Sequence, residues 1–119
     1  MEDMEARVAL NYLLDFYGPL LTPHRQEVLR LYCEEDLSQQ EIAEQLQITR
    51  QGVFDAIGKA RRQLDGYEEK LGLVRRYIAQ GEAAARCMEA LNEMAPSAAD
   101  RPAMNRAKQA LEEILKDRL

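Results

Sequence analysis

Residue types that build disulfide frameworks and metal sites are scarce in this sequence. The 119 residues include two cysteines, one histidine and no tryptophan. Cys33 and Cys87 lie far apart, and neither has a second Cys or His at the spacing of metal ligands. We therefore expect two reduced, half-buried thiols and no bound metal. A chain of this length buries enough surface to fold without a disulfide or a structural metal.

Long hydrophobic runs are also absent. No stretch reaches the roughly 18 consecutive apolar residues that a membrane span requires. The acidic opening, residues 1–5, lacks the basic start of a signal peptide. The sequence therefore predicts a cytoplasmic protein without membrane insertion. It also contains no phosphate-binding loop and no combination of nucleophile and base, so we expect a non-enzymatic protein without a cofactor.

Positive charge is in the minority and is concentrated in one segment. Lys and Arg number 16 against 21 Asp and Glu, for a net charge of −5. This balance argues against a protein that coats nucleic acid or anionic membrane, because such binding needs many cations. Residues 1–37 hold eight acids and three bases, whereas residues 50–62 hold four bases and one acid. Any contact with a polyanion is expected in the second segment.

Apolar residues recur every three or four positions, and no segment alternates with the period of a strand. The sequence therefore predicts an all-α protein that forms a single domain over residues 1–119. Within it we expect a helix-turn-helix core at about 22–64, a long helical extension at about 65–94, a linker at about 95–102 and a last helix at about 103–116.

Helix starts are marked by residues that cap the first turn. Thr22 precedes a proline, which is favoured at the first helical position. Ser38 and Glu41 have the spacing of a capping box, in which each side chain accepts a hydrogen bond from the other residue's backbone amide. Thr49 is expected to cap the following helix. A first helix over about residues 3–17 ends at Gly18.

The helix after Thr49 carries a long apolar seam with alternating steps of four and three residues. Its members are Val53, Ile57, Ala60, Leu64, Tyr67, Leu71, Val74 and Ile78. This spacing is typical of a coiled coil and keeps its phase across Gly66 and Gly72, which predicts a continuous helix. The seam needs a partner, either other helices of the same chain or a second copy. We expect a homodimer.

The segment from residue 37 to residue 64 has the order of a helix-turn-helix, whose second helix reaches base edges with its first turns. The candidate binding residues on this helix are Arg50, Gln51, Phe54, Asp55, Lys59, Arg61 and Arg62. Arginine suits guanine and phosphate, and glutamine suits adenine. Asp55 repels phosphate but accepts from cytosine, and an exposed Phe54 stacks on bases or packs on a protein.

Two resemblances extend this interpretation. The runs 21–31 (LTPHRQEVLRL) and 37–46 (LSQQEIAEQL) resemble region 4 of sigma factors and the LuxR-type helix-turn-helix. The segments 11–17 (NYLLDFY), 49–57 (TRQGVFDAI) and 65–71 (DGYEEKL) are more specific, and together they resemble the YlxM family of small bacterial helix-turn-helix proteins. The second resemblance covers about residues 7–78. It implies a sigma-region-4-like fold and an accessory or regulatory role in the signal recognition particle pathway.

Three kinds of partner stay open. The resemblance implies the RNA or the GTPase of the signal recognition particle, which the basic segment at residues 50–62 would contact. A transcriptional regulator would instead read palindromic duplex DNA through Arg50, Gln51 and Phe54. A pure protein adaptor would use the same surface without binding nucleic acid.

Overall fold

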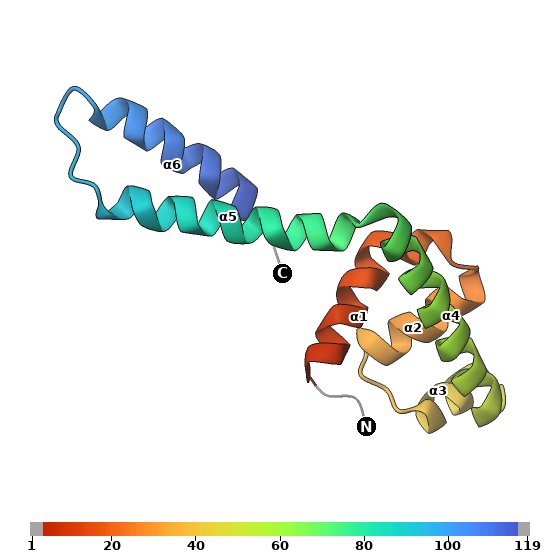
Figure 1. The fold of residues 1–119 in the computed structure, drawn as a ribbon. Helices are drawn as coiled ribbons and strands as arrows, with labels where there is room; N and C mark the ends of the chain where they lie inside the picture. The colour runs from red at the N-terminus through yellow and green to blue at the C-terminus, as the bar shows by residue number, and fades with distance from the viewer. Residues whose placement is uncertain (1–3, 117–119) are drawn as a thin grey trace. The chain divides into compact units, whose positions relative to one another are not determined.

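The computed structural model describes residues 4–116, and every regular element in this range is helical. In chain order the elements are α1 (Met4–Tyr17), a short 3-10 helix (Gly18–Leu20), α2 (Pro23–Cys33), α3 (Gln39–Leu46), α4 (Arg50–Leu71), α5 (Leu73–Glu93) and α6 (Arg101–Leu115) (Figure 1). The predicted all-α class is therefore confirmed. The chain divides into two compact units, the N-terminal unit Met1–Val74 and the C-terminal unit Arg75–Leu119.

The predicted helix starts are confirmed by their hydrogen bonds. Thr22 Oγ1 accepts from the Arg25 amide at 3.3 Å. The Glu41 amide donates to Ser38 Oγ at 3.1 Å while the Ser38 amide donates to Glu41 Oε1 at 2.9 Å, which completes the capping box. These bonds satisfy amides that have no partner inside the helix, so the start of each helix is set by residues within one turn of it.

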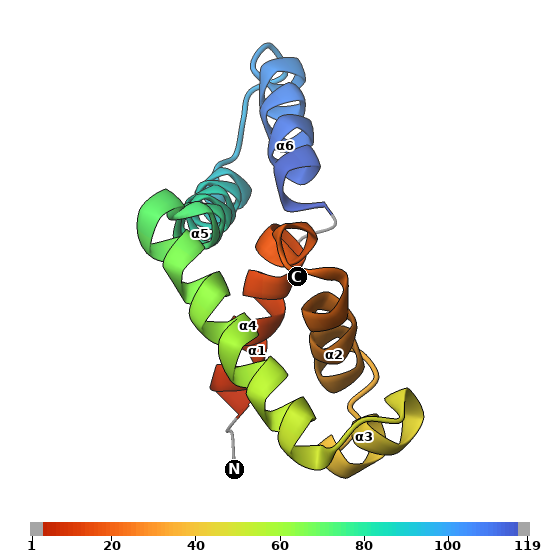
Figure 2. The same cartoon turned by 90° about the vertical axis from the view of Figure 1, so that its right-hand side faces the viewer.

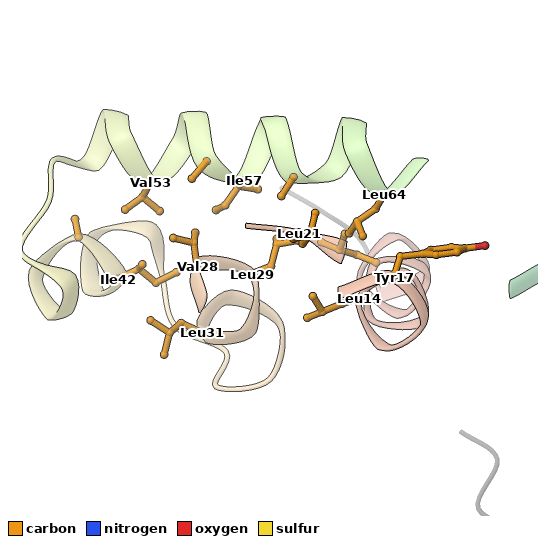
Figure 3. Close-up of a cluster of buried hydrophobic side chains, with 14 of the residues drawn as sticks. Leu14, Tyr17, Leu21, Val28, Leu29, Leu31, Ile42, Val53, Ile57 and Leu64 are labelled. Carbon is orange, nitrogen blue, oxygen red and sulfur yellow. The ribbon is translucent and has the colours of Figure 1, made fainter. Parts of the chain in front are cut away.

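The core of the N-terminal unit lies where α4 packs against α1, α2 and α3 (Figure 2). Its buried side chains come from all four helices and from the segment before α2 (Figure 3). The largest side chains that are almost fully buried are Tyr17, Val28, Leu29, Leu31, Ile42, Val53 and Leu64. Burying one aliphatic side chain of this kind contributes about 1.5 to 3 kcal/mol, so this cluster supplies most of the stabilisation of the unit.

Much of the apolar seam of α4 packs against other helices of the same chain. Val53, Ile57, Ala60 and Leu64 are buried in the core of the N-terminal unit. Farther along, Leu71 and Ile78 are 47% and 37% exposed. The seam between Val53 and Leu64 is thus unavailable to a second copy, because α1, α2 and α3 already cover it. The argument for a homodimer along this part of the seam is wrong, and the homodimer itself stays a prediction.

The long helix passes through one of its glycines and breaks at another. α4 continues through Gly66, as the seam predicts, but ends at Leu71. Gly72 follows with φ of 63°, in the left-handed region that favours glycine. The expected continuity across Gly72 is therefore wrong. A helix repeat reports which residues share a face, but it does not report a left-handed residue that ends the helix.

The C-terminal unit is a hairpin in which α6 runs antiparallel to α5 (Figure 1). Less exposed positions repeat at steps of four and three on both helices: Tyr77, Gly81, Ala84, Met88 and Leu91 on α5, and Met104, Lys108, Leu111 and Leu115 on α6. Ala85, next to Ala84, is also half-buried. α6 begins at Arg101, two residues before the expected start. Cys33 is half-buried as expected, but Cys87 on α5 is exposed, so the prediction of two half-buried thiols is wrong for Cys87.

Candidate nucleic-acid interface

The turn between α3 and α4 holds the two helices in a defined arrangement. Gln47 ends α3 in the left-handed conformation, with φ of 57°. The amides of Gln47 and Ile48 both donate to the carbonyl of Ala43, the latter at 3.0 Å. Ile48 is half-buried against the core. Thr49 then caps α4 by accepting from the Gly52 amide at 2.9 Å. The structure thus contains a short helix, a three-residue turn and a capped second helix.

The first turns of α4 present polar and aromatic side chains to solvent. Four of their residues are exposed: Arg50, Gln51, Phe54 and Asp55. Val53, which lies between them in the sequence, is buried. Phe54 is 59% exposed, as much as any large apolar side chain among the described residues. Because exposing such a ring to water stabilises nothing in the isolated chain, Phe54 is available to stack or pack on a ligand.

Two of the predicted binding residues, Gln51 and Asp55, form a hydrogen bond with each other. Gln51 Nε2 donates a hydrogen bond to Asp55 Oδ1 at 3.0 Å, one turn along the exposed face of α4. Asp55 therefore competes with any base edge or phosphate for the amide of Gln51. It also places a carboxylate in the middle of the exposed face, where it repels phosphate.

The three remaining predicted residues differ in exposure. Lys59 and Arg62 are exposed, whereas Arg61 is half-buried at the edge of the core. A Cβ added to Gly58 would lie 3.5 Å from Arg62 Nη1, so the guanidinium of Arg62 lies back over Gly58. That distance is ordinary van der Waals contact, so an alanine at this position would also fit beneath the guanidinium.

The helix beside this surface has the opposite charge. Glu41 and Glu44 lie three residues apart on α3 and both are exposed. Hydrogen bonds from the backbone and side chain of Ser38 lower the pKa of Glu41, so this carboxylate is ionised throughout the neutral range. Gln40 Nε2 donates to Glu44 Oε1 at 3.0 Å. In a helix-turn-helix on duplex DNA the first helix crosses the phosphate backbone, and carboxylates there are unfavourable.

Residues 4–101 match the model of a family described as "Putative helix-turn-helix protein, YlxM / p13 like". The chain belongs to this family. The family match covers α1 to α5 and ends at the first residue of α6. The resemblance to the YlxM family is confirmed.

Several curated members of the YlxM/p13-like family are similar over much of their length. A "UPF0122 protein" of Acetivibrio thermocellus is 42% identical over 106 residues, which are 87% of this chain and 91% of the relative. One from Geobacillus kaustophilus is 47% identical over 74 residues, 62% of this chain and 67% of the relative. One from Desulforamulus reducens is 52% identical over 68 residues, 57% of this chain and 58% of the relative.

None of the helices between residues 4 and 116 combines the length and the apolar composition needed to cross a bilayer.

Proposed function

We propose that this YlxM/p13-like protein is a non-catalytic, cytoplasmic accessory protein of the signal recognition particle pathway, and that its α4 face binds the RNA of the particle. We define the α4 face as the exposed residues Arg50, Gln51, Phe54, Asp55, Lys59 and Arg62 together with the half-buried Arg61. The observation that carries the proposal is the exposure of Phe54 between basic side chains in a chain of net charge −5. Aromatic and basic groups together bind unpaired bases and the backbone next to them.

The charges around the α4 face favour a compact RNA element over a long duplex. A duplex that lies along the first turns of α4 brings phosphates toward α3, where Glu41 and Glu44 repel them. An RNA loop needs only the α4 face, because its splayed bases reach Phe54 while Arg50 and Arg62 contact phosphates. This binding mode avoids the acidic helix.

The test is direct binding between the full chain and the purified RNA of the signal recognition particle, followed by affinity purification from lysate with and without nuclease. Reversal of Arg50 and Arg62 to Glu is expected to abolish binding, since each phosphate contact contributes to the salt-dependent affinity. Reversal of Arg75 and Arg76, which lie outside the α4 face, is the matched control. The proposal fails if wild type does not bind the RNA at about 50 mM salt, where phosphate attraction is strong.

A second candidate is a transcriptional regulator that reads duplex DNA. The capped start of α4, with Arg50 and Gln51 at its tip, favours this function because such tips meet base edges in the major groove. Replacing both residues by Ala would then relax sequence preference, each good base contact being worth about 1 to 3 kcal/mol. Enrichment of specific DNA without any component of the particle would replace the proposed role by this one.

A third candidate function is that of a protein adaptor. The pairing of an exposed Phe54 with Asp55 also suits a protein surface, where aromatic side chains are enriched at the centre of interfaces. Capture of the GTPase of the particle after nuclease treatment, with no affinity for nucleic acid at low salt, would identify this function and exclude RNA binding.

A further inference from the structure

One face of α6 carries exposed apolar side chains in a continuous line. Ala103, Ala107 and Ala110 are exposed, and Ile114 is 46% exposed. Their steps of four, three and four residues place them side by side along the helix. They lie next to the positions that face α5, of which Met104 is buried and Leu111 half-buried. α6 is thus apolar over a wider arc than one neighbouring helix covers. We call this line of four residues the α6 face.

The C-terminal unit has little core of its own. Ala84 and Met104 are its only buried hydrophobic residues among those described. Domains below about 40 residues usually require a disulfide, a metal or association to become stable, and the unit of residues 75–119 is only slightly larger. An internal disulfide is excluded by composition, because Cys87 is the single cysteine of residues 75–119. Burial of the α6 face in an association would supply apolar burial that the unit lacks.

The charges that border the α6 face are complementary to those of a second copy of the same helix. Arg106 and Glu113 lie seven residues apart on the same edge, both exposed, and neither forms an ion pair within residues 4–116. When two such helices pair antiparallel, Ala107 of one faces Ala110 of the other, and Ala103 faces Ile114. The same register sets Arg106 opposite Glu113 of the partner, twice by symmetry. In a parallel pair this charged edge would instead face the other edge of the partner helix, where Met104 and Leu111 lie, and Arg106 would not meet Glu113.

We propose that the α6 face binds a second copy of this chain, as an antiparallel helix pair with alanine layers at its centre and two Arg106–Glu113 ion pairs along its edge. Small side chains allow the two helix axes to approach closely, near the lower end of the usual 8 to 10 Å, and close approach increases dispersion contacts. The family match ends at residue 101, so this interface belongs to a part of the chain beyond the matched region.

The test is the oligomeric state of the full chain, measured by sedimentation equilibrium in reducing buffer from about 1 µM to about 0.5 mM, a range that covers micromolar dissociation constants. Wild type is expected to form dimers. Ala107→Glu puts a carboxylate at the centre of the α6 face and is expected to give monomers. Gln109→Glu, which adds the same charge on another side of α6, is the matched control and is expected to stay dimeric. Circular dichroism verifies that each variant keeps its helix content.

The register is tested by exchanging charges. Arg106→Glu and Glu113→Arg, each alone, turn two attractive pairs into two repulsive ones and should weaken the dimer about tenfold. The double variant restores opposite charges in the antiparallel register and should recover wild-type affinity. Monomeric wild type, or a dimer that Ala107→Glu does not disturb, overturns the proposed interface. Failure of the double variant to recover overturns the antiparallel register.

Discussion

The hydroxyl of Tyr17 donates a 2.7 Å hydrogen bond to Oε1 of Glu68, and this bond joins the end of α1 to the last turns of α4. The same two side chains also accept hydrogen bonds from the first turn of α5. The Leu73 amide donates to the Tyr17 hydroxyl at 3.1 Å, and the Val74 amide donates to Glu68 Oε1 at 3.0 Å. Two amides without partners inside α5 are thereby satisfied, and the break at Gly72 becomes part of the N-terminal unit.

Removing this carboxylate should therefore destabilise the N-terminal unit. Glu68→Ala leaves the Val74 amide and the Tyr17 hydroxyl without their acceptor, and we expect the free energy of unfolding to fall by about 1 to 3 kcal/mol. Glu69→Ala, at the exposed neighbouring position, is the control and should have little effect. Urea denaturation followed by circular dichroism measures both. Equal stability of the two variants would contradict the role given to Glu68.

Gly66 and Gly72 should respond oppositely to replacement by alanine. Gly66 is helical and a Cβ there meets nothing within 4 Å, so Gly66→Ala should stabilise the protein by about 0.5 to 1 kcal/mol. Gly72 has φ of 63°, where a Cβ is strained, so Gly72→Ala should cost about 1 to 2 kcal/mol. Thermal unfolding of the two variants checks the signs. A stabilising Gly72→Ala would show that α4 and α5 can form one continuous helix.

The capping box of α3 should make stability depend on acid. The Ser38 hydrogen bonds lower the pKa of Glu41 in the folded state, so the ionised carboxylate contributes stability above its unfolded pKa of about 4.3. That contribution is lost as the pH falls through the lowered folded value. Wild type should therefore be more stable than Glu41→Gln at pH 7, and the difference should vanish near pH 2. Urea midpoints measured across this range provide the test, and a difference independent of pH would refute it.

The two thiols should differ in reactivity. Burial raises the pKa of Cys33 to about 11, so at pH 8 only about one Cys33 thiol in a thousand is ionised. Cys87 is exposed on α5. A maleimide should modify Cys87 first and Cys33 only on unfolding, as read by mass spectrometry. The variants Cys33→Ser and Cys87→Ser assign each rate, and comparable rates in the folded protein would disprove the burial of Cys33.

The α4 face offers a variant that should gain affinity. Asp55→Asn removes the carboxylate that repels phosphate and releases Gln51 from a charged acceptor, so we expect RNA binding to strengthen several-fold at low salt. Asp15→Asn changes the net charge equally at an exposed position of α1 and serves as control. Fluorescence anisotropy with labelled RNA gives both affinities. An equal gain in the two variants would mean that only net charge matters and not the α4 face.

Phe54→Ala tests the aromatic part of the same surface. The ring is 59% exposed, so the free energy of unfolding should change by less than about 0.5 kcal/mol. If bases stack on it, RNA binding should weaken by about 1 to 3 kcal/mol. Isothermal titration together with urea denaturation separates the two effects. Unchanged RNA affinity would remove Phe54 from the binding surface.

Much of the candidate surface could be predicted because its determinants are local. The exposed positions of α4 follow from the buried positions Val53 and Ile57 through the helix repeat alone. The half-burial of Arg61, the bond between Gln51 and Asp55 and the position of Arg62 over Gly58 depend on rotamers and on neighbouring helices, which the repeat does not contain. The choice between RNA, DNA and protein depends on surface complementarity to a ligand.

The helical class and the starts of α2, α3 and α4 follow from the sequence alone, because periodicity and caps act between residues three or four apart. The end of the long helix and the helices that cover its seam depend on contacts made in the folded chain. The bond between Tyr17 and Glu68 spans 51 residues, and the burial of Val53 to Leu64 requires α1, α2 and α3. Contacts between residues that far apart exist only once the chain has folded, so no local pattern encodes them.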